Sequence, residues 1–213
     1  MGRSSGSAIV ATIAEARGVT LHARHGPACP GHDGVLCHDL AILSTGAAMR
    51  EPEPTTMNPN KSYGTVSAEQ KKTMTGLAFV TGLAQGTLPL NTFARTLGYD
   101  VTEAVSGRVV VSAVPNESHL NPAGTVHGGF AATLLDSCMG LAVQSTLEQG
   151  SAQTTVEFKI SLLRPITPAT GPITAEGVVL SRGRRVGTAE GRITDAQGRL
   201  LAHGTTTCLI FQT

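Results

Sequence analysis

The stretch NPAGTVHGGFAATLLDSCMGLAV, residues 121–143, decides the fold. It opens as a loop rich in Pro and Gly and continues as small and apolar residues over a length that predicts a helix of several turns. His127 leads into the glycine pair Gly128 and Gly129, and Asp136 is the only acid of the stretch. An ordinary core helix needs neither feature, so the stretch indicates a helix that also carries chemistry.

The glycine pair lies where the helix begins. The first N–H groups of a helix have no partner within the helix and carry a partial positive charge. Glycine lets a ligand approach this backbone closely, which suits a carbonyl oxygen that becomes an oxyanion during acyl transfer. The alternative is that Gly128 and Gly129 only close a tight loop, and the dipeptide alone favours that simpler interpretation.

Asp136 follows Gly128 by eight residues. At 1.5 Å and 100° per residue, the two are separated by about 12 Å along the helix and about 80° around it. One ligand therefore cannot easily touch both within a single chain. Two antiparallel copies of the helix would bring Asp136 of one chain toward Gly128 of the other, which predicts a symmetric dimer with two equivalent sites. An exposed helix acid is the alternative, but the apolar flanks Leu134–Leu135 and Cys138–Met139 argue against a solvated face.

The residues before this stretch predict two helices and a hairpin. Ser67 and Gln70 form the pattern of a capping box, which predicts a helix that continues to about Gln85. A short helix is expected between Asn91 as its cap and Gly98 as its stop, and the next strands turn at 106–107. The long helix itself is expected to end near residue 147.

The residues after the long helix predict strands. In TTVEFKISLL, residues 154–163, Val156 and Phe158 alternate with polar residues, a period of two that is typical of a half-buried strand. In this pattern Thr155 points to the face opposite Val156 and Phe158. Three more strands follow, broken at 182–183 and 196–198. We expect an α+β domain in which one curved antiparallel sheet wraps around the long helix.

Charge and hydropathy exclude several classes of protein. The 213 residues carry a formal net charge of +1 and only 15% are charged, which argues against a nucleic-acid binder with a broad basic face. No apolar run reaches the length of a membrane span, and SAIVATIA, residues 7–14, is a weak secretory signal. Four cysteines without a CxxC pair favour a reduced, cytoplasmic setting.

The N-terminal quarter differs in composition from the rest. Every aromatic residue lies at or beyond Tyr63, whereas residues 1–57 are rich in Gly, Pro and His. We expect residues 1–60 to be a poorly ordered extension and residues 61–213 to form the domain, with Met57 a plausible alternative start. CPGHDGVLCH, residues 29–38, resembles a set of metal ligands, but its spacing fits no common zinc pattern, and no metal site is predicted.

Residues 121–136 closely resemble the signature of hotdog-fold acyl-CoA thioesterases, in particular the PaaI-like phenylacetate-degradation group. The resemblance extends over about residues 75–211 and includes TTVEFKISLLRP and GRLLAHGTTTCLIF. It implies the hotdog fold, a homodimer with sites shared between subunits, and a homotetramer built from such dimers. Its motifs are specific for the fold and the group but not for the substrate.

The resemblance also implies residue roles. The Gly128 N–H would polarise the thioester carbonyl, and Asp136 of the partner subunit would act as the nucleophile or as the general base for a water. Asn121 and His127 would orient the thioester and the water. Thr155 falls where related enzymes place a Ser or Thr near the attacking water.

One departure limits the transfer. Some hotdog thioesterases carry Glu at the position of Asp136 and Ser or Thr one turn later, where this chain has Gly140. The hydroxyl of that branch is missing, so its aryl-substrate contacts are not carried over. Asp is the residue that the PaaI-like group uses.

Arginines are candidates for binding the phosphates of coenzyme A. SRGRR places Arg182, Arg184 and Arg185 on a tight turn between strands, and Arg164 precedes a proline. Guanidinium groups suit phosphate oxygens, although basic hairpin tips are commonly just solvated. His119 and His203 have no assigned chemistry.

We therefore predict a thioesterase that releases free CoA and a carboxylic acid from acyl-CoA or aryl-CoA, without a metal or redox cofactor. No GxxxxGK phosphate loop and no GxSxG elbow is present. A hotdog dehydratase or hydratase is the nearest enzymatic alternative, but its acid and His motif is not found. A non-catalytic acyl-CoA binder is the alternative from another class, and binding alone does not require Asp136.

Overall fold

The computed structural model describes residues 60–213. The predictions for residues 1–59, among them the poorly ordered extension and the Cys29–His38 motif, lie outside the described residues. The elements run in the order α2 (Ala68–Lys72), α3 (Gly76–Gln85), α4 (Thr92–Leu97), β1 (Tyr99–Val105), β2 (Arg108–Ala113), η1 (Glu117–His119), α5 (Gly128–Gln144), β3 (Ser151–Leu162), η2 (Pro168–Thr170), β4 (Ile173–Arg182), β5 (Val186–Asp195) and β6 (Leu200–Gln212).

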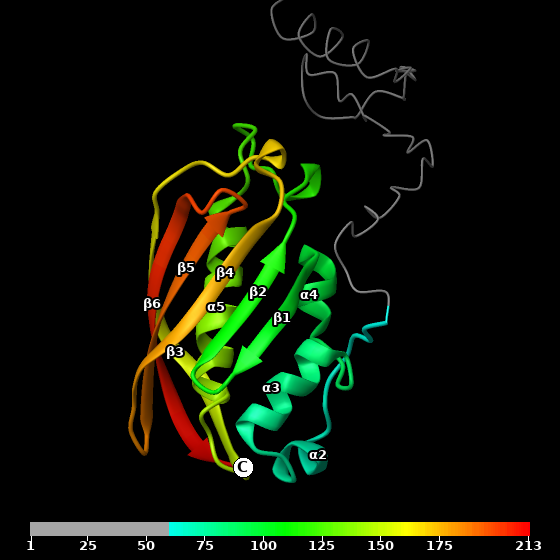
Figure 1. Ribbon diagram of the computed structural model, residues 1–213, viewed down its shortest axis with the longest axis vertical. Coiled ribbons are helices and arrows are strands. Elements are labelled where there is room, and N and C mark those ends of the chain that lie inside the picture. Colours follow the sequence, from blue (N-terminus) through cyan, green and yellow to red (C-terminus); the bar gives the residue numbers. More distant parts are fainter. Residues whose placement is uncertain (1–59) are drawn as a thin grey trace, which may run out of the picture. The chain divides into compact units, whose positions relative to one another are not determined.

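The strands form one sheet in the order β1-β2-β4-β5-β6-β3, and every neighbouring pair is antiparallel. β4, β5 and β6 are a meander of consecutive hairpins, and β3 returns to the far side of β6. The sheet curves around α5, and α3 and α4 lie beside β1 (Figure 1). The predicted hotdog fold, a curved antiparallel sheet around one long helix, is confirmed.

Small residues on the inner face of the sheet let α5 approach closely. A Cβ at Gly177 in β4 would lie 2.4 Å from the Cys138 backbone, and one at Gly191 in β5 would lie 2.8 Å from the Met139 side chain. Both distances are shorter than real Cβ contacts. Leu134, Leu135 and Met139 are fully buried on this face of α5 and form the centre of the core. Burial of such side chains stabilises the fold by roughly 1.5–3 kcal/mol each.

The helix predicted between Ser67 and Gln85 is wrong in one respect, because the structure has two helices there. Ser67 does cap α2, accepting the Gln70 N–H at 3.1 Å, but α2 ends at Lys72. Thr75 then caps α3 by accepting the Ala78 N–H at 3.2 Å. The break has a packing reason: the backbone of Gly76 lies against the end of α5 so closely that a Cβ there would sit 1.7 Å from the Gln144 carbonyl oxygen.

The remaining helix and hairpin boundaries follow the sequence closely. Asn91 caps α4 and Gly98 ends it in the left-handed conformation, as predicted. The turn between β1 and β2 lies at 106–107, also as predicted. α5 ends at Gln144, three residues before the expected end, because the Ser145 hydroxyl accepts the Gly107 N–H and donates to the Ala142 carbonyl.

β3 is an edge strand, and a bulge changes which of its residues share a face. The register with β6 shifts between Thr155 and Glu157, so Thr155 pairs with Cys208 whereas Phe158 pairs with Thr206. Thr155 and Phe158 therefore point to the same face, and the prediction that they point to opposite faces is wrong. The bulged Val156 is 62% exposed. A period-two pattern carries no signal for an inserted residue.

A buried ion pair fastens the first described residues to the sheet. Lys61 donates to the Asp100 carboxylate and, at 2.7 Å, to the Val101 carbonyl, and both charged side chains are almost fully buried. Tyr63 next to it forms a parallel bridge with Leu90. Loss of one partner of a buried pair costs about 3–5 kcal/mol, so Lys61 is an integral part of the domain.

The helices of residues 60–213 include none with the length and hydropathy required to cross a bilayer.

Candidate active site

The loop before α5 is folded by its own side chains. The Asn121 carboxamide oxygen accepts the Ala123 N–H at 2.9 Å, and its Nδ2 donates to the Thr125 hydroxyl at 2.9 Å. The Asn121 N–H donates to the Thr125 carbonyl at 2.8 Å, and Gly124 has a φ of 83°. This turn fixes the direction in which the chain enters α5.

His127 is the N-cap of α5. Its Nδ1 accepts the Gly129 N–H at 2.9 Å, and its carbonyl accepts the Phe130 N–H at 2.9 Å. The ring thus satisfies one of the N–H groups at the start of the helix. Within residues 60–213, no acceptor approaches the Gly128 N–H, which leaves this donor for a ligand. A Cβ at Gly128 would lie 2.8 Å from Leu162 Cδ1, so a larger residue here would force the Leu162 side chain to move.

The start of α5 borders a cavity of about 280 Å³, which we call the helix-start pocket. Its lining combines the loop, the first turn of α5 and the chain after β3, namely Asn121, Thr125, Val126, His127, Gly128, Ala131 and residues 162–166. Arg164 belongs to this lining, and its guanidinium donates to the Leu200 carbonyl. The pocket thus brings three predicted site residues, Asn121, His127 and Gly128, together with Arg164.

Asp136 lies in a second cavity of about 420 Å³, the carboxylate pocket. Thr155 Oγ1 donates to Asp136 Oδ1 at 2.9 Å, and both residues are half-buried. The bulge at Val156 turns Thr155 inward toward α5, so the hydrogen bond depends on the local irregularity of β3. Thr155 itself is not part of the lining, which besides Asp136 consists of Asn91, Thr92, Phe93, Tyr99, Ala132, Thr133, Ser137 and Phe158.

The walls of the carboxylate pocket are aromatic with a polar corner. Phe93 and Phe158 are 54% and 41% exposed, which is high for residues of this size. Ser137 Oγ donates to the Tyr99 hydroxyl at 3.2 Å, and Asn91 lies 3.3 Å from the same hydroxyl. The sequence did not single out these residues, because their spacing of up to 67 positions gives no local pattern.

The two pockets share no lining residue. Gly128 and Asp136 are about 12 Å apart along α5 at the helical rise. One chain therefore carries a hydrogen-bond donor in one pocket and a carboxylate with its hydroxyl partner in the other. A hydrogen-bond donor and a carboxylate are two of the groups that acyl-transfer sites use.

The predicted arginine turn lies far from the helix-start pocket of the same chain. Arg182, at the end of β4, forms an ion pair with Glu148, which follows α5. Figure 1 places the turn between β4 and β5 near the C-terminal end of α5. Arg184 and Arg185 on this turn are exposed. Of the four predicted arginines, only Arg164 lies at the start of α5.

Two cysteines and two histidines lie outside both linings, namely Cys138, Cys208, His119 and His203. Burial raises the pKa of the Cys138 and Cys208 thiols, which keeps them protonated and unreactive. His119 stacks on Phe130 with 4.2 Å between the ring centroids, and burial lowers its pKa. His203 faces Glu190 at 3.8 Å. Among residues 60–213, no three His, Cys, Asp or Glu side chains are grouped as metal ligands.

Comparison with known proteins identifies the family. The profile of the thioesterase superfamily matches residues 123–202, which include the start of α5, Asp136 and the meander. Human acyl-coenzyme A thioesterase 13 is 32% identical over 114 residues, which are 53% of this chain and 80% of the human protein. The chain belongs to the thioesterase superfamily.

Two further proteins extend this comparison. A Halobacterium salinarum protein with a provisional esterase name is 38% identical to this thioesterase-superfamily chain over 99 residues; the match covers 44% of this chain and 64% of the relative. The structure of the phenylacetic acid degradation-related protein of Ralstonia eutropha JMP134 superposes with a TM-score of 0.56 at 30% identity. That match covers 62% of this chain and 98% of the other.

Proposed function

We propose that two copies of this chain hydrolyse acyl-CoA or aryl-CoA thioesters to free CoA and a carboxylic acid, as members of the PaaI-like group. The observation that carries the proposal is the hydrogen bond from Thr155 to Asp136 in a pocket separate from Gly128. A carboxylate held by a hydroxyl suits an attack on a carbonyl, and the free Gly128 N–H suits the oxyanion that forms. The two groups meet only across a subunit interface.

An antiparallel pair of α5 helices brings them together. With the partner subunit's Asp136 beside Gly128, the thioester carbonyl oxygen accepts the Gly128 N–H. Asn121 and His127 orient the substrate from the loop. Gly129 leaves room beside the substrate because it has no side chain, while its N–H donates to His127. The C-terminal end of the partner's α5 then lies about 12 Å beyond the start of α5 at the helical rise. The partner's Arg182, Arg184 and Arg185 lie near that end, where they can meet the phosphates of the coenzyme.

The chemical step balances with water as the second substrate. As a general base, the Asp136 carboxylate takes a proton from water while the water oxygen bonds to the carbonyl carbon. The tetrahedral intermediate then expels the CoA thiolate, which takes the proton back from Asp136 and leaves as the thiol, so the carboxylate is regenerated. As a nucleophile, Asp136 would form a mixed anhydride that water hydrolyses. In both routes Thr155 orients the carboxylate and the water.

The proposal includes no metal or redox cofactor, because the backbone N–H activates the carbonyl and the carboxylate activates the water. The aromatic walls formed by Phe93, Tyr99 and Phe158 suit an apolar acyl or aryl group. A homotetramer and a cytoplasmic location remain predictions from the resemblance and the cysteine content.

The test is CoA release, followed with a thiol reagent, against a panel of aryl-CoA and straight-chain acyl-CoA thioesters. We expect Asp136→Asn to lower kcat by two or more orders of magnitude while the oligomer stays intact. Asp136→Asn is nearly isosteric, so the fold is preserved. If wild type binds CoA but turns over no thioester, the chain is a binding module and the proposal fails.

A single turnover in ¹⁸O-labelled water can identify the nucleophile route through Asp136. In the nucleophile route, labelled water attacks one of the two carbonyl carbons of the anhydride. Attack at the Asp136 carboxyl carbon places the label on Asp136, whereas attack at the acyl carbon places it on the product acid. The general-base route labels the product acid alone. Label on Asp136 therefore identifies the nucleophile.

A further inference from the structure

Arg199 is a guanidinium held in place with most of its donors free. Arg199 lies in the turn between β5 and β6, where its Nε donates to Asp195 Oδ2 at 2.6 Å. The Asp195 carboxylate is itself held by the N–H groups of Gln197 at 3.0 Å and Arg199 at 2.9 Å. The Arg199 side chain is 62% exposed, and within residues 60–213 its Nη groups have no recorded partner. An anchored Nε with free Nη groups fixes the direction of the guanidinium fork.

The Asp195 carboxylate is not exposed at the surface. The Asp195 side chain is fully buried beneath the turn. Burial opposes its ionisation, but the hydrogen bonds from Arg199 and Gln197 outweigh this effect and lower its pKa. Asp195 therefore remains an anion that anchors Arg199 from below, and the outer side of the guanidinium faces solvent.

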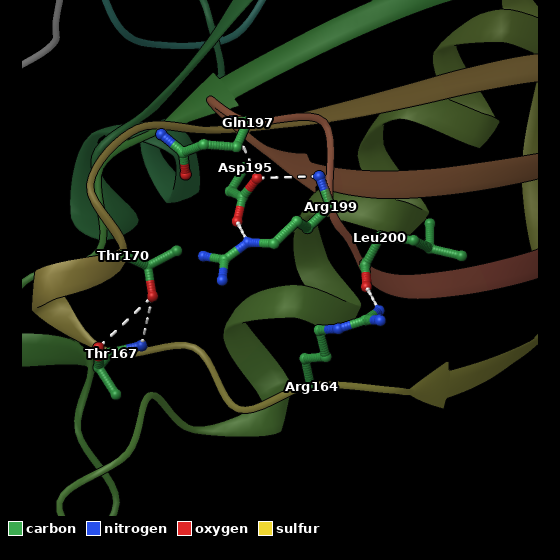
Figure 2. Close-up of polar contacts among 7 residues, drawn as sticks. All are labelled: Arg164, Thr167, Thr170, Asp195, Gln197, Arg199 and Leu200. Atoms are coloured by element: carbon green, nitrogen blue, oxygen red, sulfur yellow. Dashed lines mark hydrogen bonds and ion pairs between the residues drawn. The ribbon is translucent and has the colours of Figure 1, made fainter.

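Arg164 is anchored to the same hairpin. Its Nη1 donates to the carbonyl of Leu200, the residue that follows Arg199, and its backbone N–H donates to the Leu201 carbonyl at 3.1 Å. Figure 2 shows the Arg199 guanidinium pointing toward the loop that carries Thr167 and Thr170, and the Arg164 guanidinium pointing toward the first residue of β6. The β5–β6 hairpin thus holds two arginines, Arg164 and Arg199, and one buried carboxylate, Asp195.

Arg164 and the turn that carries Arg199 lie at the end of the molecule where α5 begins. Arg164 lines the pocket, and Figure 1 places the turn between β5 and β6 at the same end of the molecule as the start of α5. Leu162, which touches the Gly128 position, pairs with Ala202. Arg199 precedes Ala202 by three residues, so it lies roughly 10 Å further along the strand direction. The phosphates of CoA are separated from the thioester by the pantetheine arm, so they need a site at some distance from Gly128.

We infer that Arg199 and Arg164 form a binding site for the phosphate groups of coenzyme A, with Arg199 as a phosphate-binding residue that the sequence patterns did not indicate. The inference rests on the proposed function, since it places the coenzyme in the helix-start pocket. Guanidinium forks bind phosphate oxygens in pairs of hydrogen bonds, and anchoring lowers the entropy lost on binding. The β4–β5 turn of the partner is the competing location for the same phosphates.

The experiment measures binding of coenzyme A and of pantetheine, which lacks the phosphates, by calorimetry at low ionic strength. Arg199→Gln and Arg164→Gln are each expected to weaken CoA about ten-fold, because each removes charge-assisted hydrogen bonds. Pantetheine binding is expected to stay unchanged. The salt dependence of CoA binding is expected to flatten in both variants.

Matched variants separate the site from general charge effects. Arg192→Gln removes an exposed arginine from the outer side of β5 and is expected to leave CoA binding unchanged. Arg184→Gln tests the competing turn. CoA binding by Arg199→Gln at wild-type affinity overturns the inference, and so does an equal loss of CoA and pantetheine, which would indicate damage to the hairpin. A ten-fold loss in Arg184→Gln alone also overturns it.

The inference and the proposed function fail separately. If CoA binding depends on Arg199 and Arg164 but wild type hydrolyses no thioester, the phosphate site stands and the hydrolase does not. If wild type hydrolyses acyl-CoA and neither arginine variant changes CoA affinity or KM, the hydrolase stands and the phosphate site does not. Wild type that binds no CoA overturns the inference.

Discussion

The helix-start pocket and the carboxylate pocket lie along the same helix but are built in different ways. In the first, the free donor is a backbone N–H, and side chains of the loop hold it in place through capping and turn hydrogen bonds. In the second, the acceptor is a side chain, Asp136, and its partner Thr155 comes from a bulged edge strand. The donor half is therefore fixed by local sequence, whereas the acceptor half depends on a contact between residues 19 positions apart.

This difference teaches that each half can be altered without disturbing the other. The pockets have no lining residue in common, so a substitution at Asp136 leaves the capping of α5 intact. A substitution at Gly128 likewise leaves the hydrogen bond between Thr155 and Asp136 intact. If the halves belong to different subunits in the working enzyme, their defects should also be separable between chains.

Mixing two inactive chains gives the largest expected effect. Asp136→Asn and Gly128→Val are each expected to retain about one per cent of wild-type activity or less. After unfolding and refolding of an equal mixture, half of the dimers hold one chain of each kind, and each such dimer has one intact site of two. Activity should then recover to about a quarter of the wild-type value.

The control is the same refolding of each variant alone, which should recover nothing. A mixture that stays as inactive as its components, although mixed dimers are present by mass spectrometry, would contradict a site shared between subunits. It would require that Asp136 and Gly128 act within one chain, against their 12 Å helical separation.

Thr155→Val sharpens the acceptor half. Valine has the shape of threonine but lacks the hydroxyl that donates to Asp136. A hydrogen bond to a charged group contributes about 1.5–3 kcal/mol, so kcat should fall about ten-fold or more. Thr155→Ser retains the hydroxyl and should stay within a few-fold of wild type. Steady-state kinetics with one acyl-CoA check both, and equal kcat for Val and wild type would remove Thr155 from the site.

Much of the fold was predictable because it depends on local sequence patterns. The caps at Asn91 and Gly98, the turn at 106–107 and the breaks of the meander follow from residue types within a few positions. The wrapping of the sheet around α5 followed from one long apolar helix among antiparallel strands. Thr75 also caps a helix, but the pattern of Ser67 and Gln70 led us to expect a single helix there.

The errors and omissions share a physical cause, because each depends on contacts between distant residues. The split between α2 and α3 depends on Gly76 packing against Gln144, 68 positions away. The bulge that turns Thr155 inward depends on pairing with β6. The ion pair of Lys61 with Asp100 and the hydrogen bond from Arg164 to the Leu200 carbonyl are likewise tertiary. The sequence alone indicated the candidate residues Asn121, His127, Gly128 and Asp136 because they fall within one short stretch.

His127→Ala sharpens the donor half with a smaller effect. Alanine cannot accept the Gly129 N–H, and loss of a side-chain cap costs about 1 kcal/mol of stability. Urea unfolding measures this loss. His127→Asn provides an acceptor that caps helices well, so it should retain most of the stability. If His127 also orients the substrate, KM should rise in both variants. If KM rises only in the less stable His127→Ala variant, the role of His127 is limited to capping.

The smallest expected effect is a pH dependence confined to the donor half. The His119 carbonyl accepts the His127 backbone N–H at 2.8 Å. The His119 ring stacks on Phe130, and its Nδ1 accepts the Asn116 N–H at 3.1 Å. Burial lowers the pKa of His119, so the unfolded chain binds its proton at a higher pH than the folded chain does. Stability should therefore fall as the pH drops below the ordinary histidine value of about 6.5, with a slope of at most about 1.4 kcal/mol per pH unit from this one group.

Urea unfolding at pH 7.5 and pH 5.5 checks this direction, with His119→Gln as the matched variant. Glutamine can accept the Asn116 N–H but does not titrate, so its stability should be lower at pH 7.5 and less dependent on pH. The hydrogen bond between Thr155 and Asp136 involves no histidine, so protection of the middle of α5 against hydrogen exchange should change less than protection of its first turn. Equal loss of protection along α5 would mean that the helix opens as one unit, and the two halves would then be separate in chemistry but not in stability.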